Sequence, residues 1–252
     1  MPKTSYPTYD PAPGYMTQKI QSKYIATAIE SNALPTQAYR MTEIISLSAP
    51  NNSLKPIQFW QLYSVLGQQR IVSIVRHFYT KVYQDEPWFS SVFRQIGDLN
   101  HHVNTQSSMW LDVMGGGLTY HGAEFRLNFH HQHNAFELMN EKGANRWMKL
   151  MLETLDECTT YLTGDPRVRI SINTFLSYFM EKYAADFGFE NKAIFGPTNP
   201  PITRKINFLN MTDSAIEALS KAQLKEALAS RKALTIDEHT TKHELIQMAK
   251  RL

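Results

Sequence analysis

Four stretches of this 252-residue chain repeat their apolar residues at the three-and-four spacing of an amphipathic helix. They cover residues 68–83, 99–114, 147–162 and 168–183. In the first stretch the repeating positions are Ile71, Ile74, Val75, Phe78 and Val82. No comparable segment alternates apolar and polar residues as a half-buried strand does. The sequence therefore predicts an all-α core over residues 57–187.

Breaks in the pattern divide the rest of the chain. Three consecutive glycines, residues 115–117, are expected to end the second helix, because glycine supplies backbone freedom and no side chain to pack. Residues 1–56 are rich in proline and small polar residues and predict a partly helical N-terminal extension. Residues 188–213 hold three prolines without a helical period and indicate a linker.

The C-terminal segment, residues 214–252, has the signals of a small helical pair. Ser220 with Gln223, and Thr241 with Glu244, each match the capping box that satisfies free N–H groups in a first helical turn. Leucines on the two predicted helices are spaced to meet one another. We expect a helix, an extended loop and a second helix.

Charge and cysteine content exclude some classes of protein. The 26 basic and 23 acidic residues nearly balance, so the net charge of +3 does not by itself imply a nucleic-acid partner. No apolar run reaches the roughly 18 residues of a membrane span. Cys158 is the only cysteine, which excludes an internal disulfide. These features predict a soluble, cytoplasmic protein without a membrane partner.

Histidines are concentrated in the predicted core. Six of the nine fall between residues 101 and 133, and three of them lie in FHHQHNAF, residues 129–136. Adjacent histidines do not share one helical face, so one member of each pair is expected to be solvated. A solvated surface, a metal site and a haem pocket are all compatible with this cluster.

The order of motifs across residues 59–160 resembles the truncated haemoglobins, and is closest to their group II. The motifs that carry the resemblance are HFY at 77–79, Phe93, HHVNTQSSMW at 101–110, GGG at 115–117, HNAF at 133–136 and RWMKLM at 146–151. The resemblance implies a two-on-two helical sandwich that binds b-type haem and an oxygen or other diatomic ligand.

The resemblance also implies the residues that contact the haem. A proximal histidine is followed three residues later by phenylalanine and 13 or 14 residues later by tryptophan, which His133, Phe136 and Trp147 match. His133 is thus the expected iron ligand, through neutral imidazole nitrogen, while His130 and His131 are expected to face solvent or a haem propionate. Further haem contacts are expected from Phe78 and Phe93.

On the opposite, distal side the resemblance places Tyr79, His102, Gln106 and the indole of Trp147 as hydrogen-bond donors to the ligand. His102 is also a candidate sixth iron ligand. A histidine at its position is typical of group III, which lacks the glycine motif, so the sequence combines features of two subgroups.

Several functions are compatible with such a pocket. Reversible ligand binding is the first, and nitric-oxide dioxygenase or peroxidase-like turnover, supplied by a reductase or substrate outside the chain, is an extension of it. A haem-dependent sensor or adaptor is the alternative, in which residues 214–252 bind nucleic acid or a protein partner. A non-haem metal site would need carboxylates near the histidines, and the core offers few.

Residues 219–252 resemble SAP-type helix-extended-loop-helix modules, many of which bind DNA or RNA. Seven positive and five negative charges over residues 214–252 predict weak, salt-sensitive phosphate binding at best. The glycine of that family's loop is absent, and residues 235–241 stand in its place. A helical hairpin that packs on the core is the other interpretation.

Overall fold

The computed structural model describes residues 6–121, 123–198, 208, 211–229, 236–237 and 239–252. The chain divides into two compact units, residues 1–202 and residues 203–252. The described residues form helices and no strand, and the only β-type pairing among them is an isolated bridge between Ala12 and Gly116. None of the described helices combines the length and hydropathy that a membrane span requires.

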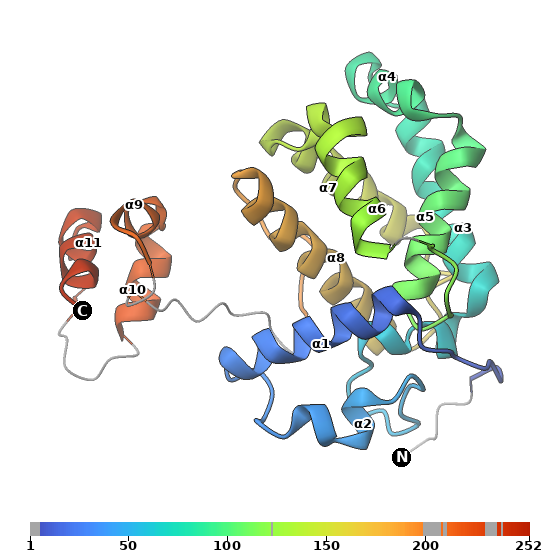
Figure 1. The fold of residues 1–252 in the computed structure, drawn as a ribbon, viewed down its shortest axis with the longest axis horizontal. Helices are drawn as coiled ribbons and strands as arrows, with labels where there is room; N and C mark the ends of the chain where they lie inside the picture. The colour runs from blue at the N-terminus through green and yellow to red at the C-terminus, as the bar shows by residue number, and fades with distance from the viewer. Residues whose placement is uncertain (1–5, 122, 199–207, 209–210, 230–235, 238) are drawn as a thin grey trace. The chain divides into compact units, whose positions relative to one another are not determined.

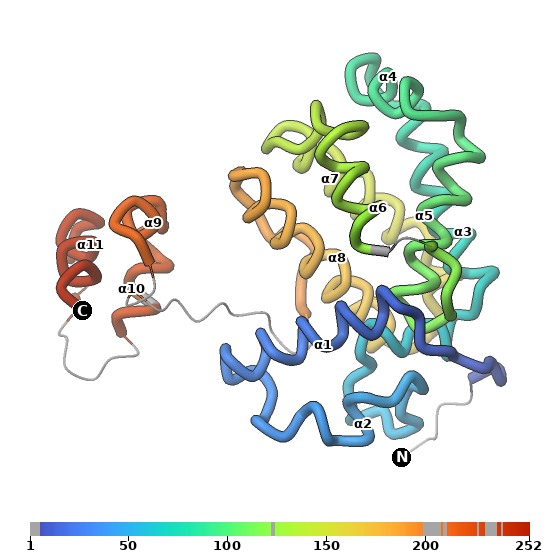
Figure 2. Tube along the Cα trace, in the orientation of Figure 1, coloured from blue at the N-terminus to red at the C-terminus, as the bar shows by residue number. Residues whose placement is uncertain are grey.

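The first unit contains both long and short helices, and Figure 2 follows the chain through them. In chain order they are α1 (Tyr15–Glu30), η1 (Ala38–Arg40), α2 (Thr42–Ile45), η2 (Phe59–Gln61), α3 (Tyr63–Gln84), α4 (Pro87–Ile96), α5 (Leu99–Val113), α6 (Ala123–Phe129), η3 (His130–Asn134), η4 (Phe136–Leu138), α7 (Glu141–Glu157) and α8 (Pro166–Phe187). Within this unit the long helices α3, α5, α7 and α8 lie close together, and α1 crosses near their ends (Figure 1).

The four predicted stripes correspond to α3, α5, α7 and α8, which confirms the all-α prediction. The five apolar positions of the first stripe are all buried. Helix α7 ends at Glu157, five residues before the end of the apolar stripe over residues 147–162 from which it was predicted. The chain turns at Cys158, and two threonines follow, whose branched side chains lose rotamer freedom in a helix.

Packing brings the helices of the first unit around one hydrophobic core. Helix α3 packs against α4, α5 and α7. The rings of Trp110 and Phe175, 4.9 Å apart and nearly perpendicular, join α5 to α8. Helix α8 starts with Pro166 directly after Asp165, whose carboxylate accepts the Arg167 N–H, so both residues favour a helix start here.

The N-terminal extension is attached to the core partly through the start of α1, where a side chain of α5 accepts the hydrogen bonds of the first turn. Helix α1 starts after Gly14, and the carboxylate of Asp112 on α5 accepts hydrogen bonds from Thr17 Oγ1 at 3.2 Å and from the backbone of Thr17 and Met16. A Cβ on Gly14 would lie 1.5 Å from Asp112 Oδ1, so only glycine leaves room for this contact. Burial raises the pKa of Asp112 despite these bonds.

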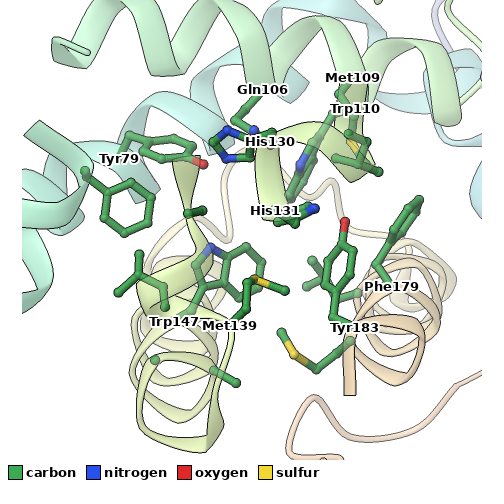
Figure 3. A pocket seen from close by; sticks show the side chains of 18 of the residues that line it. Tyr79, Gln106, Met109, Trp110, His130, His131, Met139, Trp147, Phe179 and Tyr183 are labelled. Carbon is green, nitrogen blue, oxygen red and sulfur yellow. The ribbon is translucent and has the colours of Figure 1, made fainter. Parts of the chain in front are cut away.

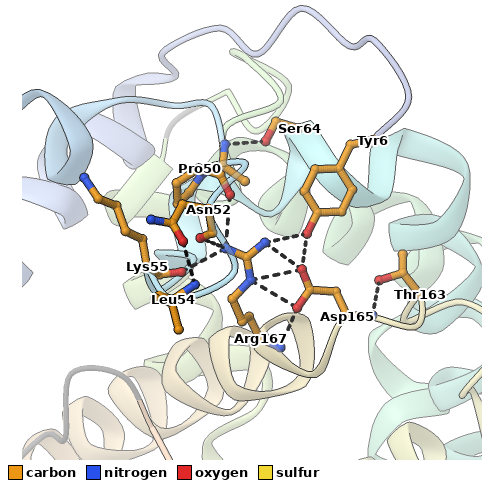
Figure 4. Close-up of polar contacts among 10 residues, drawn as sticks. Tyr6, Pro50, Asn52, Leu54, Lys55, Ser64, Thr163, Asp165 and Arg167 are labelled. Atoms are coloured by element: carbon orange, nitrogen blue, oxygen red, sulfur yellow. Dashed lines mark hydrogen bonds and ion pairs between the residues drawn. The ribbon is translucent and has the colours of Figure 1, made fainter. Parts of the chain in front are cut away.

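A second contact fastens the extension to the start of α8 (Figure 4). The Arg167 guanidinium pairs with Asp165 and also donates to the hydroxyl of Tyr6 at 3.0 Å. Its remaining amino group donates to three backbone carbonyls, those of Pro50, Asn52 and Lys55, at 2.8 to 3.0 Å. Arg167 is 8% exposed, so a buried cation holds the loop over residues 50–55 against α8.

The second unit has its own small core, built from α9 (Asp213–Ala218), α10 (Lys221–Ala229) and α11 (Lys242–Lys250). Its buried apolar residues are Phe208, Ile216, Leu224, Leu228, Leu245 and Ala249. Both predicted capping boxes are present, with the reciprocal bonds of Ser220 with Gln223 and of Thr241 with Glu244. Residues 230–235 and 238, between α10 and α11, and part of the predicted linker lie outside the described residues.

Candidate functional site

A cavity of about 110 Å³ opens among α3, α4, α5, α7, α8 and the segment α6–η4. Its walls are mostly apolar and aromatic, with contributions from Phe89, Phe93, Met109, Trp110, Leu127, Met139, Phe175, Phe179 and Met180. Polar groups reach it from Tyr79, Gln106, His130, His131, Trp147 and Tyr183 (Figure 3). An apolar cavity into which a few polar groups converge is typical of a small-molecule site.

Three of the predicted distal residues line this cavity. Tyr79 comes from α3, Gln106 from α5 and Trp147 from α7. Tyr79 is 5% exposed, and burial raises the pKa of its phenol, so the hydroxyl keeps its proton at neutral pH. These side chains therefore bring hydrogen-bond donors from three helices to one space.

Two predicted aromatic contacts take different places. Phe93 of α4 lines the cavity, with its ring 5.9 Å from that of Tyr79. Phe78 is buried in the core and does not line the cavity, but its ring lies 5.0 Å from Trp147. Phe78 thus supports the indole from behind, because successive residues of α3 point in different directions.

Of the two expectations for His130 and His131, the structure contradicts the solvent-facing position, and contact with a haem propionate stays a prediction. Both line the cavity, where Figure 3 shows His130 near Gln106 and Tyr79. The ring of His131 lies 4.3 Å from that of Tyr183. Burial, aided by the neighbouring imidazole, lowers the pKa of His131 to about 3, and burial also lowers the pKa of His130. Both imidazoles are therefore neutral near pH 7.

His133 and Phe136 do not point into the cavity, which corrects the predicted orientation of both. His133 is exposed, and its ring stacks on Phe129 with centroids 4.2 Å apart. Its Nδ1 donates to the carbonyl of Phe129 at 3.0 Å. Phe136 is 61% exposed and lies near Phe187 instead.

The reason for these orientations is a single wide turn. Residues 130–134 form a π-helix, in which the N–H of Ala135 bonds to the carbonyl of His130 at 2.9 Å. The extra residue in this turn changes the angular position of every side chain after it. Because of this turn, His130 and His131 line the cavity and His133 does not, while the role of His133 as iron ligand stays a prediction.

His102, the predicted sixth ligand, lies behind the cavity wall. It is 3% exposed, does not line the cavity, and stacks on Tyr79 with centroids 5.3 Å apart. Its Nδ1 lies 2.7 Å from the hydroxyl of Tyr83. Burial is the main cause that lowers the pKa of His102 to about 4. Tyr83 was not among the residues predicted from the sequence to form the site.

The wall contributed by α8 was also not predicted as part of the site. Phe175, Phe179, Met180 and Tyr183 line the cavity. All four belong to the fourth apolar stripe, so their burial was predictable, but a stripe alone does not tell a cavity wall from solid core. Burial raises the pKa of Tyr183 well above its usual value, which keeps this phenol protonated as well.

The histidine cluster does not form a metal cage. Across the described part of the chain, no three histidine, cysteine or acidic side chains come together in a metal-binding arrangement. The cavity instead combines neutral imidazoles with apolar walls. This donor set suits a prosthetic group whose iron needs one histidine from the protein.

Residues 61–176 match the model of the bacterial-like globin family. The chain is 29% identical over 97 residues to two-on-two hemoglobin-3 of Arabidopsis thaliana, covering 38% of this chain and 54% of the relative. It is 30% identical over 110 residues to group 2 truncated hemoglobin 3-1 of Lotus japonicus, covering 43% and 64%. The chain thus spans between about half and two thirds of these relatives. No solved structure matches it.

The family match lies within the helical core and ends at residue 176, so the likeness of residues 219–252 to SAP-type modules stays a prediction. Within the core the match agrees with an all-α unit whose long helices enclose an apolar cavity lined by tyrosine, tryptophan and histidine. Residues 61–176 of this chain therefore belong to the bacterial-like, or truncated, globin family.

Proposed function

We propose that the first unit binds b-type haem in the cavity and uses it to bind oxygen or another diatomic ligand reversibly. The observation that carries this proposal is the convergence of the Tyr79 hydroxyl, the Trp147 indole and neutral imidazoles in a buried apolar space. Membership of a globin family implies a haem protein. The chemistry that haem supplies when bound is reversible coordination of a small ligand at iron.

The polar side chains that line the cavity are suited to a haem, but the cavity is too small for a porphyrin unless one of its walls moves. His131 keeps a buried Nδ1 without a hydrogen-bond partner, which is a costly state that a ligand or a rearrangement would relieve. At about 110 Å³ the cavity is smaller than the roughly 300–1,000 Å³ of sites for drug-sized ligands. Uptake of a porphyrin therefore requires one wall to move, and the short α6–η4 segment, which carries the π turn, is the wall we expect to do so.

His133 is the proposed iron ligand. Metal-bound histidines almost always donate their second ring nitrogen to a carbonyl, carboxylate or water. His133 already does this, because its Nδ1 donates to the Phe129 carbonyl, so its Nε2 carries the lone pair that a metal needs. His133 lies outside the cavity, so the η3 segment has to turn for Nε2 to reach it. Phe93 and Trp147 line the cavity and would pack against the bound group. Phe136 would reach it only after the same turn of the segment, and Phe78 would support the Trp147 indole.

Haem titrations of four proteins test this assignment: the native chain and the single alanine variants of His130, His131 and His133. We expect a characteristic haem spectrum for the native chain and for His130→Ala and His131→Ala. For His133→Ala we expect loss of the spectrum of histidine-ligated haem. Addition of imidazole should restore this spectrum, since free imidazole replaces the missing side chain.

Comparing which variants lose the haem spectrum shows which part of the proposal is wrong. If His131→Ala loses the spectrum and His133→Ala keeps it, the haem function stands and the cavity-facing His131 is the ligand. If the native chain takes up no haem, the function itself is wrong. Circular dichroism of each variant checks that the helices are intact.

Tyr79, Gln106 and Trp147 are proposed to donate hydrogen bonds to the bound gas. If haem holds oxygen in the cavity, the bound gas would carry partial negative charge and would accept hydrogen bonds from these side chains. A hydrogen bond to a charged group contributes about 1.5–3 kcal/mol, which slows ligand escape roughly tenfold to a hundredfold. The buried phenol of Tyr79 keeps its proton, because burial raises its pKa, and so it is available as a donor.

Tyr79→Phe is therefore expected to accelerate oxygen dissociation roughly tenfold or more, because one donor is removed without changing the shape of the wall. Stopped-flow displacement of oxygen measures this rate. Tyr24→Phe is the matched control, because Tyr24 is equally buried but lies outside the cavity lining, and its hydroxyl has no hydrogen-bond partner. Equal rates in the native chain and Tyr79→Phe would remove Tyr79 from the ligand contacts.

Simple ligand binding is preferred over the other proposals. Dioxygenase or peroxidase-like turnover needs a reductase or substrate from outside the chain. The sensor alternative needs residues 214–252 to hold a partner. In that module Lys250 is engaged by Asp213 and Glu217 at 3.0 and 2.6 Å, which reduces the positive charge available to a phosphate. The predicted contributors Arg231 and Lys232 lie outside the described residues.

A further inference from the structure

Helix α6 is a weakly attached part of the cavity wall. Among its side chains at residues 124–129, Leu127 alone is buried, and it lines the cavity. Phe125 is 77% exposed and Phe129 is 47% exposed, so neither ring contributes much apolar burial. A helix of seven residues is also too short to be stable without tertiary contacts. The polar contacts of α6 with its neighbours therefore have a large share in holding it in place.

Polar contacts reach α6 from α1 and from α8. The two oxygens of the Glu124 carboxylate pair with Lys19 Nζ at 2.6 Å and with Lys23 Nζ at 2.7 Å. Because these lysines are four residues apart on α1, they lie on the same face of that helix. From α8, Lys182 Nζ donates to the side-chain oxygen of Asn128 at 3.3 Å. Glu124 and Asn128 are also four residues apart, so two helices hold the same face of α6.

The ion pairs of Glu124 are expected to be stronger than those of a fully exposed carboxylate. Its side chain is 16% exposed, and each of its oxygens has its own cation. Burial alone would raise the pKa of Glu124, but hydrogen bonds from Lys19 and Lys23 outweigh it, and the pKa is lowered. Glu124 is therefore charged at neutral pH, and loss of both lysines would leave a partly buried carboxylate without a counter-charge.

Helix α1 is firmly attached and forms the fixed side of this contact. Its residues Met16, Ile20, Tyr24 and Ile25 are buried in the core of the first unit. Its first turn is held by the carboxylate of Asp112. Segments with few buried apolar contacts open more readily than segments anchored in a core. The ion pairs between α1 and α6 therefore restrain mainly α6.

We propose that the N-terminal extension acts as a clamp on the cavity wall, in which Lys19 and Lys23 hold Glu124 and thereby set how often the α6–η4 segment opens to admit haem. This inference rests on the proposed haem function, in which that segment is the wall that moves. The family match begins at residue 61, so α1 lies outside it. The clamp thus gives an addition to the globin core control over the rate at which the cofactor enters.

Hydrogen exchange of the full chain without haem, measured by mass spectrometry, tests the clamp directly. In Glu124→Gln we expect the amides of residues 127–134 to exchange roughly threefold to tenfold faster, because two ion pairs to one carboxylate are lost. Glu157→Gln is the matched control. Glu157 likewise pairs with two side chains of another helix, His77 and Lys81 of α3, at 2.9 and 2.8 Å, and none of the three lines the cavity. This control should leave the exchange of residues 127–134 unchanged.

A change on the α1 side separates the clamp from a general loss of structure. Lys19→Gln combined with Lys23→Gln should speed the exchange of the same amides to a similar degree. Adding Glu124→Gln should have little further effect, since all three changes remove the same ion pairs. Helix α1 should stay protected throughout. Equal exchange of residues 127–134 in the native chain and Glu124→Gln refutes the clamp. So does faster exchange of α1 together with α6, because α1 is then not the fixed side.

Stopped-flow mixing of haem with the haem-free full chain tests the consequence for uptake. Because opening has to precede entry, Glu124→Gln should take up haem faster by about the same factor by which its exchange rises, and Glu157→Gln should match the native chain. Equal uptake despite faster exchange would refute α6 as the entry wall while leaving haem binding intact. A native chain without haem uptake refutes the haem function, and the exchange result then still decides whether α1 restrains α6.

Discussion

Replacing Arg167 with methionine is expected to lower the free energy of unfolding of the first unit by about 3–5 kcal/mol, the usual cost of removing one partner from a buried ion pair. The guanidinium is almost completely buried and pairs with Asp165 through two of its nitrogens. Its removal leaves that carboxylate, which is 8% exposed, without its cation. It also leaves three carbonyls of the loop over residues 50–55 without the donor they share.

Urea denaturation of Arg167→Met and of Arg169→Met measures this cost against a matched control. Arg169 lies two residues away on α8 and pairs with Asp156, which is 63% exposed, so its loss should cost no more than about 1 kcal/mol. Equal losses in the two variants would show that the buried network adds nothing to stability. A loss of unfolding free energy in Arg167→Met but not in Arg169→Met would show that the contacts of Arg167 with α8 and the extension stabilise the first unit.

The stability that the Asp165–Arg167 pair contributes is expected to decrease in acid. Burial alone would raise the pKa of Asp165, but hydrogen bonds from Arg167 and Tyr6 outweigh it, and the pKa is lowered. A lowered carboxylate pKa gives stability that is present above the unfolded pKa, roughly 3.9, and is lost as the pH falls through the folded value. The difference in stability between the native chain and Arg167→Met should therefore narrow in acid.

Gly115→Ala is expected to destabilise the first unit by roughly 3–6 kcal/mol, combining backbone strain with overpacking. Gly115 has a φ of 93°, a region that residues with a side chain rarely adopt. A Cβ there would lie 2.2 Å from the backbone oxygen of Trp60, which is fully buried and has no room to retreat. The carbonyl of Gly115 also accepts a hydrogen bond from the backbone N–H of Ala12. A displacement of Gly115 would therefore also weaken the attachment of the N-terminal extension.

Gly117→Ala separates the two causes. Gly117 has a φ of 110°, so the backbone strain is similar, but the nearest atom to its Cβ is Ala12 Cβ at an ordinary 3.7 Å. We expect this variant to lose only the backbone contribution, roughly 1–3 kcal/mol. Thermal unfolding followed by circular dichroism compares the two. If Gly117→Ala is as damaging as Gly115→Ala, the contact with Trp60 is not the cause.

The helices and their ends were largely predictable because they depend on neighbours in sequence. Periodic apolar residues produced α3, α5, α7 and α8, and Asp165 with Pro166 marks where α8 starts. Tyr79, Gln106 and Trp147, each on a regular α-helix, line the cavity, and their contact with a bound ligand stays a prediction. For these parts of the molecule, local spacing and the final position agree.

Tertiary structure decided the features that no local pattern specifies. Residues 130–134 form a π turn, and in the folded chain His130 and His131 line the cavity while His133 stays exposed. The contact of 2.7 Å between His102 Nδ1 and the hydroxyl of Tyr83, nineteen positions earlier in the chain, also depends on the packing of α5 against α3. Residues distant in sequence, among them Arg167 and the loop over residues 50–55, become partners only when the chain folds, because hydrogen bonds and burial depend on distance in space.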